Sequence, residues 1–214
     1  MGVINVLGAG KSFYRQWLFR DIHINFDLSP GNSYALLGNN GSGKSTFLLM
    51  LAGQITPTEG SIEWKINEAS ISENARFYQY TLSSPAMELP EELNLSEWFA
   101  FLQKVKQMQA HVTLDYISDI CGFTQKTLLK PIGNYSSGMK QRVKLCGNLL
   151  CDTPISFLDE PLSNLDAAGI LLYQNLIEQQ RSQKAIFVAS NDNKEYEFVE
   201  NRFEILNKQI IQVQ

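Results

Sequence analysis

A glycine-rich run before residue 46 carries residue types that bind phosphate groups. Residues 38–45 read Gly-Asn-Asn-Gly-Ser-Gly-Lys-Ser and fit the pattern G-x-x-x-x-G-K-[ST] at every fixed position. Glycines let backbone N–H groups converge on phosphate oxygens, Lys44 supplies a charge for the β- and γ-phosphates, and Ser45 offers a hydroxyl to Mg²⁺. The candidate binding residues are Gly38, Asn39, Asn40, Gly41, Ser42, Gly43, Lys44, Ser45 and Thr46. The run predicts a site for a nucleoside triphosphate.

Two carboxylates follow a short apolar run later in the chain. Residues 155–158 read Ile-Ser-Phe-Leu, and Asp159 and Glu160 come directly after them. In an open α/β sheet, ligands bind beyond the C-terminal ends of the strands, where the phosphate-binding loop also lies. We therefore expect Asp159 to hold Mg²⁺ and Glu160 to face the γ-phosphate and polarise an attacking water.

The elements that position these residues alternate between strands and helices. An apolar strand precedes the glycine-rich loop, and a buried helix follows it. Alternation of this kind predicts a mainly parallel sheet with helices on its faces. The expected elements are a strand at 33–37, a helix at 44–52, a helix at 140–150, a strand at 155–158, a helix at 167–181, a strand at 185–188, and a closing hairpin at 202–206 and 209–213.

The middle of the chain has a different character. Residues 95–108 place apolar side chains on one helical face, and Thr113 can cap a second helix that Gly122 ends. We expect a helical subdomain at about 86–138, inserted in the core of a single domain that spans 1–214.

The N-terminal region is predicted to be β-structure, with strands at 22–26 and 61–65. Residues 8–12 read Gly-Ala-Gly-Lys-Ser and end like the phosphate-binding pattern, but Asn5 stands where its first glycine should be. We expect this segment to be a turn.

Composition excludes several classes of protein. Apolar residues make up 44% of the 214 residues, which is enough for a buried core. The net charge of −4 argues against a dedicated nucleic-acid binder, so no nucleic-acid partner is expected. The longest apolar run, 47–52, is far shorter than the roughly 18 residues of a membrane-spanning helix. Without a secretory signal, and with three cysteines that lack metal-ligand spacing, a cytoplasmic location is expected.

Two further motifs resemble those of one protein family. Residues 135–143 read Tyr-Ser-Ser-Gly-Met-Lys-Gln-Arg-Val and resemble the signature of ATP-binding cassette (ABC) proteins, which normally reads Leu-Ser-Gly-Gly-Gln. Residues 161–166, Pro-Leu-Ser-Asn-Leu-Asp, resemble the D-loop of that family. Together with the phosphate-binding loop and the acidic strand end, they identify a short, single-cassette nucleotide-binding domain of an ABC transporter. The resemblance implies a P-loop NTPase fold with a RecA-like, mainly parallel core sheet, an N-terminal antiparallel part and a helical subdomain.

The resemblance implies an ATPase subunit that dimerises around MgATP and drives a separate transmembrane permease. In this family two cassettes, identical or different, hold each γ-phosphate between one phosphate-binding loop and the opposite signature. Ser136, Ser137 and Gly138 are therefore expected to act on the partner's ATP, and Asp166 belongs to the same nucleotide site. The chain would lie at the cytoplasmic face of the membrane, bound to its permease. The aromatic face of Trp98 and Phe99 would help form the groove that receives it.

Two departures from the family lie near the nucleotide. Ser137 replaces the first signature glycine, and Met139 replaces the glutamine.

An aromatic residue near the N-terminus usually stacks on adenine in this family, and Phe13 fits best, with Tyr14 and Trp17 as alternatives.

Two further departures concern catalysis and coupling. The family glutamine that senses Mg²⁺ should fall near Pro85, but the nearest one upstream is Gln79, six residues away. Asn191 stands where the family has its switch histidine, and an amide can donate a hydrogen bond but cannot relay a proton. We expect ATP binding to survive and hydrolysis, with Glu160 and Asn191 at the reacting end, to be slower. The alternative is an ATP-gated regulatory or soluble ABC-type protein with little hydrolysis.

Overall fold

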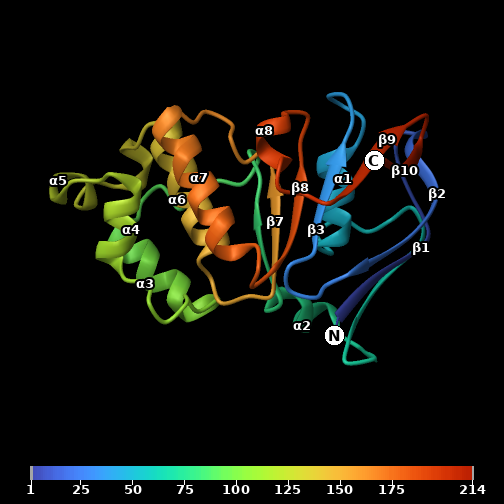
Figure 1. The fold of residues 1–214 in the computed structure, drawn as a ribbon, viewed down its shortest axis with the longest axis horizontal. Helices are drawn as coiled ribbons and strands as arrows, with labels where there is room; N and C mark the ends of the chain where they lie inside the picture. The colour runs from blue at the N-terminus through green and yellow to red at the C-terminus, as the bar shows by residue number, and fades with distance from the viewer. Residues whose placement is uncertain (1, 214) are drawn as a thin grey trace.

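Two β-sheets organise residues 2–213, the part of the chain that the computed structural model describes (Figure 1). The strands are β1 (Gly2–Phe13), β2 (Gln16–Asp27), β3 (Ser33–Leu37), β4 (Glu59–Ile66), β5 (Ala69–Ser70), β6 (Tyr80–Ser83), β7 (Ile155–Asp159), β8 (Ala185–Ala189), β9 (Asn201–Leu206) and β10 (Gln209–Val213). The first sheet is antiparallel, in the order β2-β1-β4-β5. The second, in the order β10-β9-β3-β8-β7-β6, is parallel except for β10 at its edge. The predicted α/β class, with an antiparallel N-terminal part, is confirmed.

Helix α1 (Lys44–Leu51) lies between the two sheets and joins them into one core. Phe26 of β2, Phe47 of α1 and Phe187 of β8 are fully buried there. The ring centroid of Phe26 is 6.4 Å from that of Phe47 and 5.4 Å from that of Phe187. Since buried aromatic contacts of this kind fix orientation as well as bury area, they hold the start of α1 beside the strand ends.

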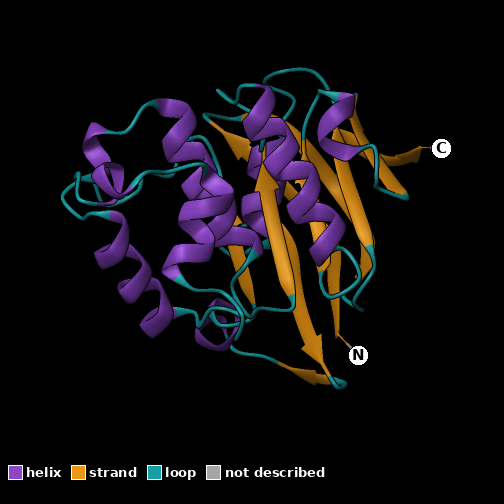
Figure 2. Ribbon diagram, turned by 60° about the vertical axis from the view of Figure 1, so that its left-hand side comes forward, coloured by secondary structure: helices purple, strands orange, loops and turns teal. Residues whose placement is uncertain are grey.

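Helices α6 (Ser137–Leu149) and α7 (Ala167–Gln180) cover the opposite face of the parallel sheet (Figure 2). Successive side chains of a strand point to opposite faces, so Ile186 and Val188 of β8 pack with these helices while Phe187 packs with α1. Strands buried on both faces read as continuous apolar runs, which is why β7 and β8 were visible in the sequence.

The helices between β6 and α6 lie at one end of the molecule, on the left in Figure 1. They are α3 (Leu95–Val105), α4 (Leu114–Cys121) and α5 (Gln125–Leu128), followed by a 3₁₀ turn at Ile132–Asn134. Asn94 and Glu97 form a capping box at the start of α3. As predicted, Thr113 caps α4 and Gly122 ends it with φ +69°. Two short helices complete the fold, α2 (Glu73–Phe77) and α8 (Asn193–Tyr196).

The predicted turn at residues 8–12 is wrong, because the segment continues strand β1. Gly8 has φ +59°, and the pairing of β1 with β2 shifts between Val6 and Ala9, so the strand accommodates the glycines as bulges. Gly60 of β4 lies so close to the Gly8 carbonyl that a Cβ at Gly60 would clash with it. This approach of two distant segments has no local signal in the sequence.

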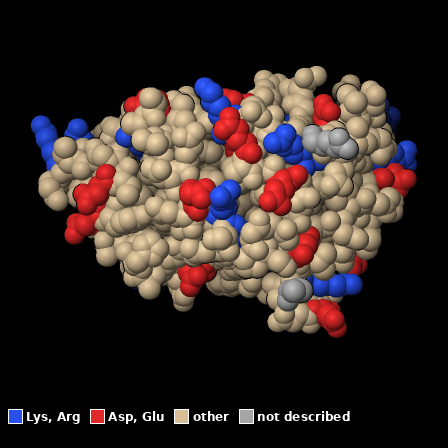
Figure 3. Space-filling view, in the orientation of Figure 1, with Lys and Arg blue, Asp and Glu red and all other residues tan. Residues whose placement is uncertain are grey.

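Charged side chains of both signs lie on the surface. On the face drawn in Figure 3, acidic and basic side chains alternate and no continuous basic patch is seen. None of the helices described between residues 2 and 213 combines the length and the apolar character needed to cross a membrane.

Candidate nucleotide-binding site

The phosphate-binding loop connects β3 to α1, as its pattern requires. Gly38 and Gly43 have φ of +140° and +106°, values that L side chains rarely adopt. Lys44, the first residue of α1, is 4% exposed, and its ammonium donates to the carbonyls of Gly38 (2.8 Å) and Asn39 (3.2 Å). The charged group is thus already folded over the loop in which phosphate would lie.

The loop has a polar group without a partner and space beside its backbone. The Ser42 hydroxyl is buried and has no hydrogen-bond partner among the residues that the structure describes. A Cβ built at Gly41 would meet no atom within 4 Å. A free donor, an open backbone and the N-terminus of α1 together suit an anion.

Three oxygen-bearing side chains meet at the end of β7. Asp159 is 4% exposed and accepts hydrogen bonds from the hydroxyls of Ser45 (2.8 Å) and Ser84 (3.1 Å). Burial raises the pKa of Asp159, and the two hydroxyl donors offset part of that rise. Carboxylate and hydroxyl oxygens are the donors that Mg²⁺ prefers, and a divalent cation would offset the cost of burying the carboxylate. The donor set therefore fits the expected ion.

Ser84 was not identified from the sequence as a site residue. It directly follows β6, whose last residue Ser83 pairs with Leu158 of β7, so it lies beside Asp159. The sequence predicts no strand at this point, near which the family glutamine should fall, so the parallel pairing of β6 with β7 is needed to see the contact. A serine, not a glutamine, touches the carboxylate.

Glu160 is held in an uncommon backbone conformation. Its φ is +43°, and its N–H donates to the Ala189 carbonyl at the end of β8 (2.9 Å). The Ser163 hydroxyl lies 3.4 Å from its carboxylate. Non-glycine residues with left-handed φ cost free energy and persist where the surroundings fix them, which is common at functional sites.

Asn191 reaches the phosphate-binding loop. Its side-chain nitrogen donates to the Asn40 side-chain oxygen at 3.0 Å, across 151 residues of sequence. Both side chains are exposed, so the contact lies at the mouth of the site. The predicted residues 38–45, Asp159, Glu160 and Asn191 thus lie together at the C-terminal ends of strands β3, β7 and β8.

A second hollow of about 410 Å³ lies at the start of α6. Ser136 caps that helix by accepting from the Met139 N–H (3.2 Å), and Ser136, Ser137 and Gly138 line the hollow. A Cβ at Gly138 would lie 2.9 Å from the Asn164 carbonyl, so only glycine fits without movement. The helix begins three residues before the predicted start at 140.

Comparison with known proteins decides the family. The sequence model of the ABC transporter family matches residues 22–163.

The chain belongs to the ABC transporter family.

Two curated relatives cover most of this chain. The ABC transporter I family member 1 of Arabidopsis thaliana is 32% identical over 176 residues, which are 78% of this chain and 73% of the relative. The cytochrome c biogenesis ATP-binding export protein CcmA of Rhizobium johnstonii is 31% identical over 172 residues, 79% of each chain. A solved ATP-binding subunit of an ABC transporter superposes with a TM-score of 0.81 at 21% identity, covering 99% of this chain and 90% of that one.

The predictions of family, fold and activity are therefore confirmed. The chain is an ATP-binding, ATP-hydrolysing subunit of the ABC transporter family. The regulatory alternative, with little hydrolysis, finds no support in these relatives. Chains of this kind generally dimerise and act with permeases.

The D-loop of this ABC subunit is tied to the signature helix. The Gln141 side chain donates to the Pro161 carbonyl (2.8 Å), and Arg142 donates to the Asp166 carboxylate (2.6 Å). Asp166 also caps α7 by accepting from the Gly169 N–H (2.9 Å). The backbone donor and, after it, Arg142 lower the pKa of Asp166. In this chain Asp166 therefore organises the D-loop, and its predicted nucleotide contact stays a prediction.

The predicted adenine-stacking residue lies beside the turn between β1 and β2, near one tip of the antiparallel sheet. Phe13, at the end of β1, is 45% exposed, and the Lys11 ammonium lies 5.0 Å from its ring centroid. Tyr14 is fully exposed, and Arg20 covers Trp17 with its guanidinium 4.6 Å from the ring centroid. The antiparallel sheet does reach the phosphate-binding loop through Phe19, whose ring lies 3.1 Å from the Cβ position at Gly43. The Phe13 assignment stays a prediction.

Proposed function

We propose that this ABC subunit hydrolyses MgATP in a head-to-tail dimer at the cytoplasmic face of the membrane and drives a separate permease. The observation that carries the proposal is the hydrogen bond between Ser45 and Asp159. It joins the phosphate-binding loop to the acidic strand end, where Glu160 follows. The chain's own residues thus present phosphate donors, oxygen ligands and a candidate base within one site.

The proposed roles follow from the side chains. Backbone N–H groups of residues 38–43 and Lys44 bind the β- and γ-phosphates. Ser45 and Asp159 hold Mg²⁺, with Ser84 beside them, and the bound ion neutralises charge on the phosphate oxygens. Glu160 orients a water and accepts its proton as the water oxygen bonds to the γ-phosphorus and the bond to the β-phosphate oxygen breaks.

A second copy or a related cassette completes each site. The hollow at Ser136–Gly138 is open and has the start of the 13-residue helix α6 on its wall, so it can receive the γ-phosphate of a facing subunit. Asn191 donates its amide from the same side as the phosphate-binding loop. One chain therefore supplies the phosphate-binding half of one ATP site and the signature half of another. Each ATP lies between two chains.

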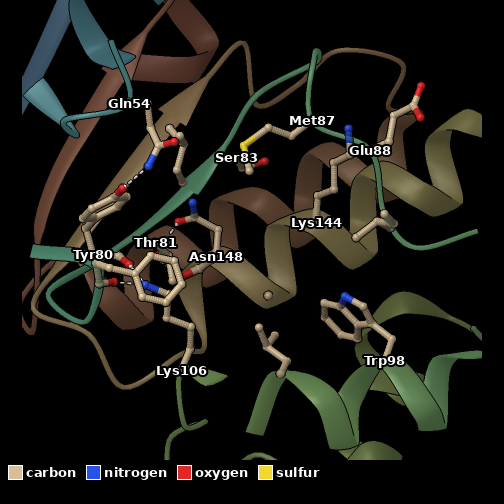
Figure 4. Close-up of a pocket in the computed structure, with 15 residues that line it drawn as sticks. Gln54, Tyr80, Thr81, Ser83, Met87, Glu88, Trp98, Lys106, Lys144 and Asn148 are labelled. Atoms are coloured by element: carbon tan, nitrogen blue, oxygen red, sulfur yellow. Dashed lines mark hydrogen bonds between the residues drawn. The ribbon is translucent and has the colours of Figure 1, made fainter. Parts of the chain in front are cut away.

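The permease is proposed to dock in a groove between the core and the helical subdomain, taken as residues 86–138 (Figure 4). The groove encloses about 290 Å³. Trp98 of α3 faces it from one wall, and Thr81 and Ser83 of β6 lie on the other. Phe99, which was expected beside Trp98 in the groove, is not among the residues that line it, and both rings belong to one buried cluster. A short amphipathic segment fits a groove of this kind.

Lys144 connects the groove to the nucleotide site. It lines the groove from α6, and its ammonium donates to the Ser84 carbonyl at 3.3 Å. The Ser84 hydroxyl in turn contacts Asp159. We infer that Ser84 takes the place of the family's glutamine, so that a permease segment in the groove and Mg²⁺ at Asp159 act on the same short segment.

The test is Mg²⁺-dependent ATP hydrolysis by the purified protein beside Glu160→Gln. We expect turnover by the wild type, a loss of about 100-fold or more in the variant, and retained ATP binding by both. ATP should also shift Glu160→Gln from monomer to dimer in light scattering. Equal hydrolysis by the two proteins would refute the role of Glu160, and a monomer under saturating MgATP would refute the dimer.

A further inference from the structure

A buried carboxyl group lies outside the residues that bind phosphate. Glu195 of α8 is 4% exposed, and it takes part in no ion pair within the described residues. Its carboxylate accepts the Leu162 N–H at 2.6 Å. Burying an unpaired carboxylate is costly, so a specific contact must justify its presence. The Leu162 contact joins it to the D-loop, and Ser190 also acts on the carboxyl group.

Leu162 lies in the turn that carries Glu160. The turn is closed by a bond from the Ser163 N–H to the Glu160 carbonyl (3.1 Å), and the Ser163 hydroxyl lies 3.4 Å from the Glu160 carboxylate. The Glu160 backbone is strained at φ +43°. A strained conformation of this kind needs support from its surroundings, and Glu195 supplies a hydrogen bond to the middle of the turn.

Glu195 is itself fixed from two sides. The Tyr173 hydroxyl of α7 donates to its carbonyl (2.5 Å), and Asp192 caps α8 through the Lys194 N–H (3.0 Å). The same segment begins with Asn191, which contacts Asn40. These contacts fix the backbone of residues 191–195, and from this fixed backbone the Glu195 side chain reaches the D-loop.

We propose that Glu195 is a positioning residue for hydrolysis: its carboxyl holds the Leu162 N–H and thereby keeps Glu160 aimed at the attacking water. The inference rests on the role of Glu160 proposed above. It also makes the segment after β8 a common support for two parts of the site, Asn191 at the phosphate-binding loop and the turn at Glu160.

The protonation of Glu195 offers a readout that simple packing would not change. Burial raises its pKa to about 7, while Ser190 and Leu162 act in the opposite direction. The titratable groups that face it are Glu160 at the end of β7, Asp192 in its own segment and Tyr173 of α7. An ionised carboxylate accepts a stronger hydrogen bond than a protonated one. Glu195→Gln mimics the protonated form and keeps an acceptor.

The test compares Glu195→Ala, Glu195→Gln and the control Glu197→Ala, which removes an exposed carboxylate two residues away. We expect Glu195→Ala to lower kcat about 10-fold with KM for MgATP within about 2-fold, because misplacing a catalytic group affects the chemical step. Glu195→Gln should approach the wild-type rate at pH 6 and fall about 3-fold below it at pH 8. Glu197→Ala should match the wild type throughout.

Amide hydrogen exchange of residues 160–163 gives a second measurement that needs no turnover. Glu195→Ala should speed exchange in this segment and leave the phosphate-binding loop unchanged. Unaltered exchange, or a kcat equal to that of Glu197→Ala, would overturn the inference. If Glu195→Ala does not fold, the pH comparison of Glu195→Gln decides, and a constant ratio to the wild type overturns it. If Glu160→Gln is inactive and Glu195→Ala is fully active, the positioning role of Glu195 is refuted and the proposed function stands. If Glu160→Gln is active, the proposed function itself is refuted.

Discussion

The two halves of the proposed ATP site differ in how far one chain completes them. At the phosphate-binding loop, Lys44 is held by two carbonyls, Ser45 by Asp159, and Asn191 by Asn40. At the signature, Ser136 does no more than cap its own helix beside an open hollow. The first half is organised by contacts within one chain, whereas the second is proposed to act against a facing chain. The comparison indicates that nucleotide capture and hydrolysis depend on different parts of the molecule.

The largest expected effect follows from the phosphate-binding half. Lys44→Ala removes the charge proposed to bind the β- and γ-phosphates, and we expect ATP affinity to fall about 100-fold, since contacts between charged groups are among the strongest. Equilibrium dialysis or calorimetry measures it on the single chain. Lys11→Ala, which removes a lysine from the other Gly-Lys-Ser segment, is the control and should bind ATP normally. An equal loss of ATP affinity in both variants would show that residues 38–45 are not the distinct phosphate-binding segment.

The signature half should respond in the opposite way. Gly138→Ala places a Cβ 2.9 Å from the Asn164 carbonyl, which must move the signature helix or the D-loop. We expect hydrolysis to fall about 10-fold or more while ATP binding by the single chain stays within about 2-fold. Steady-state kinetics and a binding titration on the same preparation separate the two. A matched loss of binding would show that the halves are not independent.

A smaller effect is expected where the chain departs from its family. Asn191→His replaces an amide, which stays neutral, by an imidazole that can carry a proton. We expect hydrolysis to rise about 3-fold, with little change in ATP affinity. The matched control is Asn191→Ala, which loses the contact with Asn40 and should not exceed the wild type. If histidine lowers the rate, the amide is itself adapted to this site.

The smallest effect concerns stability and pH. The pKa of Glu195 rises from 4.5 to about 7 on folding, so between these values the folded chain holds a proton that the unfolded chain releases. Stability from this group therefore falls as pH rises from about 4.5 to 7 and is level above. The Tm difference between Glu195→Gln and the wild type should widen in favour of the variant over this window, by a few degrees. A difference independent of pH would contradict the assignment.

The parts of the fold that the sequence predicts are those set by local spacing. The order of strand 33–37, glycine loop and helix needs no distant contact, and β7 and β8 are buried on both faces and read as apolar runs. Thr113 and Gly122 likewise mark the ends of α4 because capping is local.

What the sequence could not predict depends on pairing between distant segments. Ser84 reaches Asp159 through the register of β6 against β7, and Asn191 meets Asn40 across 151 residues. Gly8 continues strand β1 because Gly60 approaches it from β4. The contact between Glu195 and Leu162 belongs to the same class, since a single glutamate in a polar segment carries no signal of burial.

The two carbonyls that hold the Lys44 ammonium have a consequence for the life of the protein between turnovers. When ATP leaves, this buried cation returns to partners within its own loop and is not left bare in the interior. When a nucleotide enters or leaves, the Lys44 ammonium therefore exchanges carbonyl contacts for phosphate contacts, or the reverse. The loop can therefore keep its ammonium group hydrogen-bonded between one nucleotide and the next.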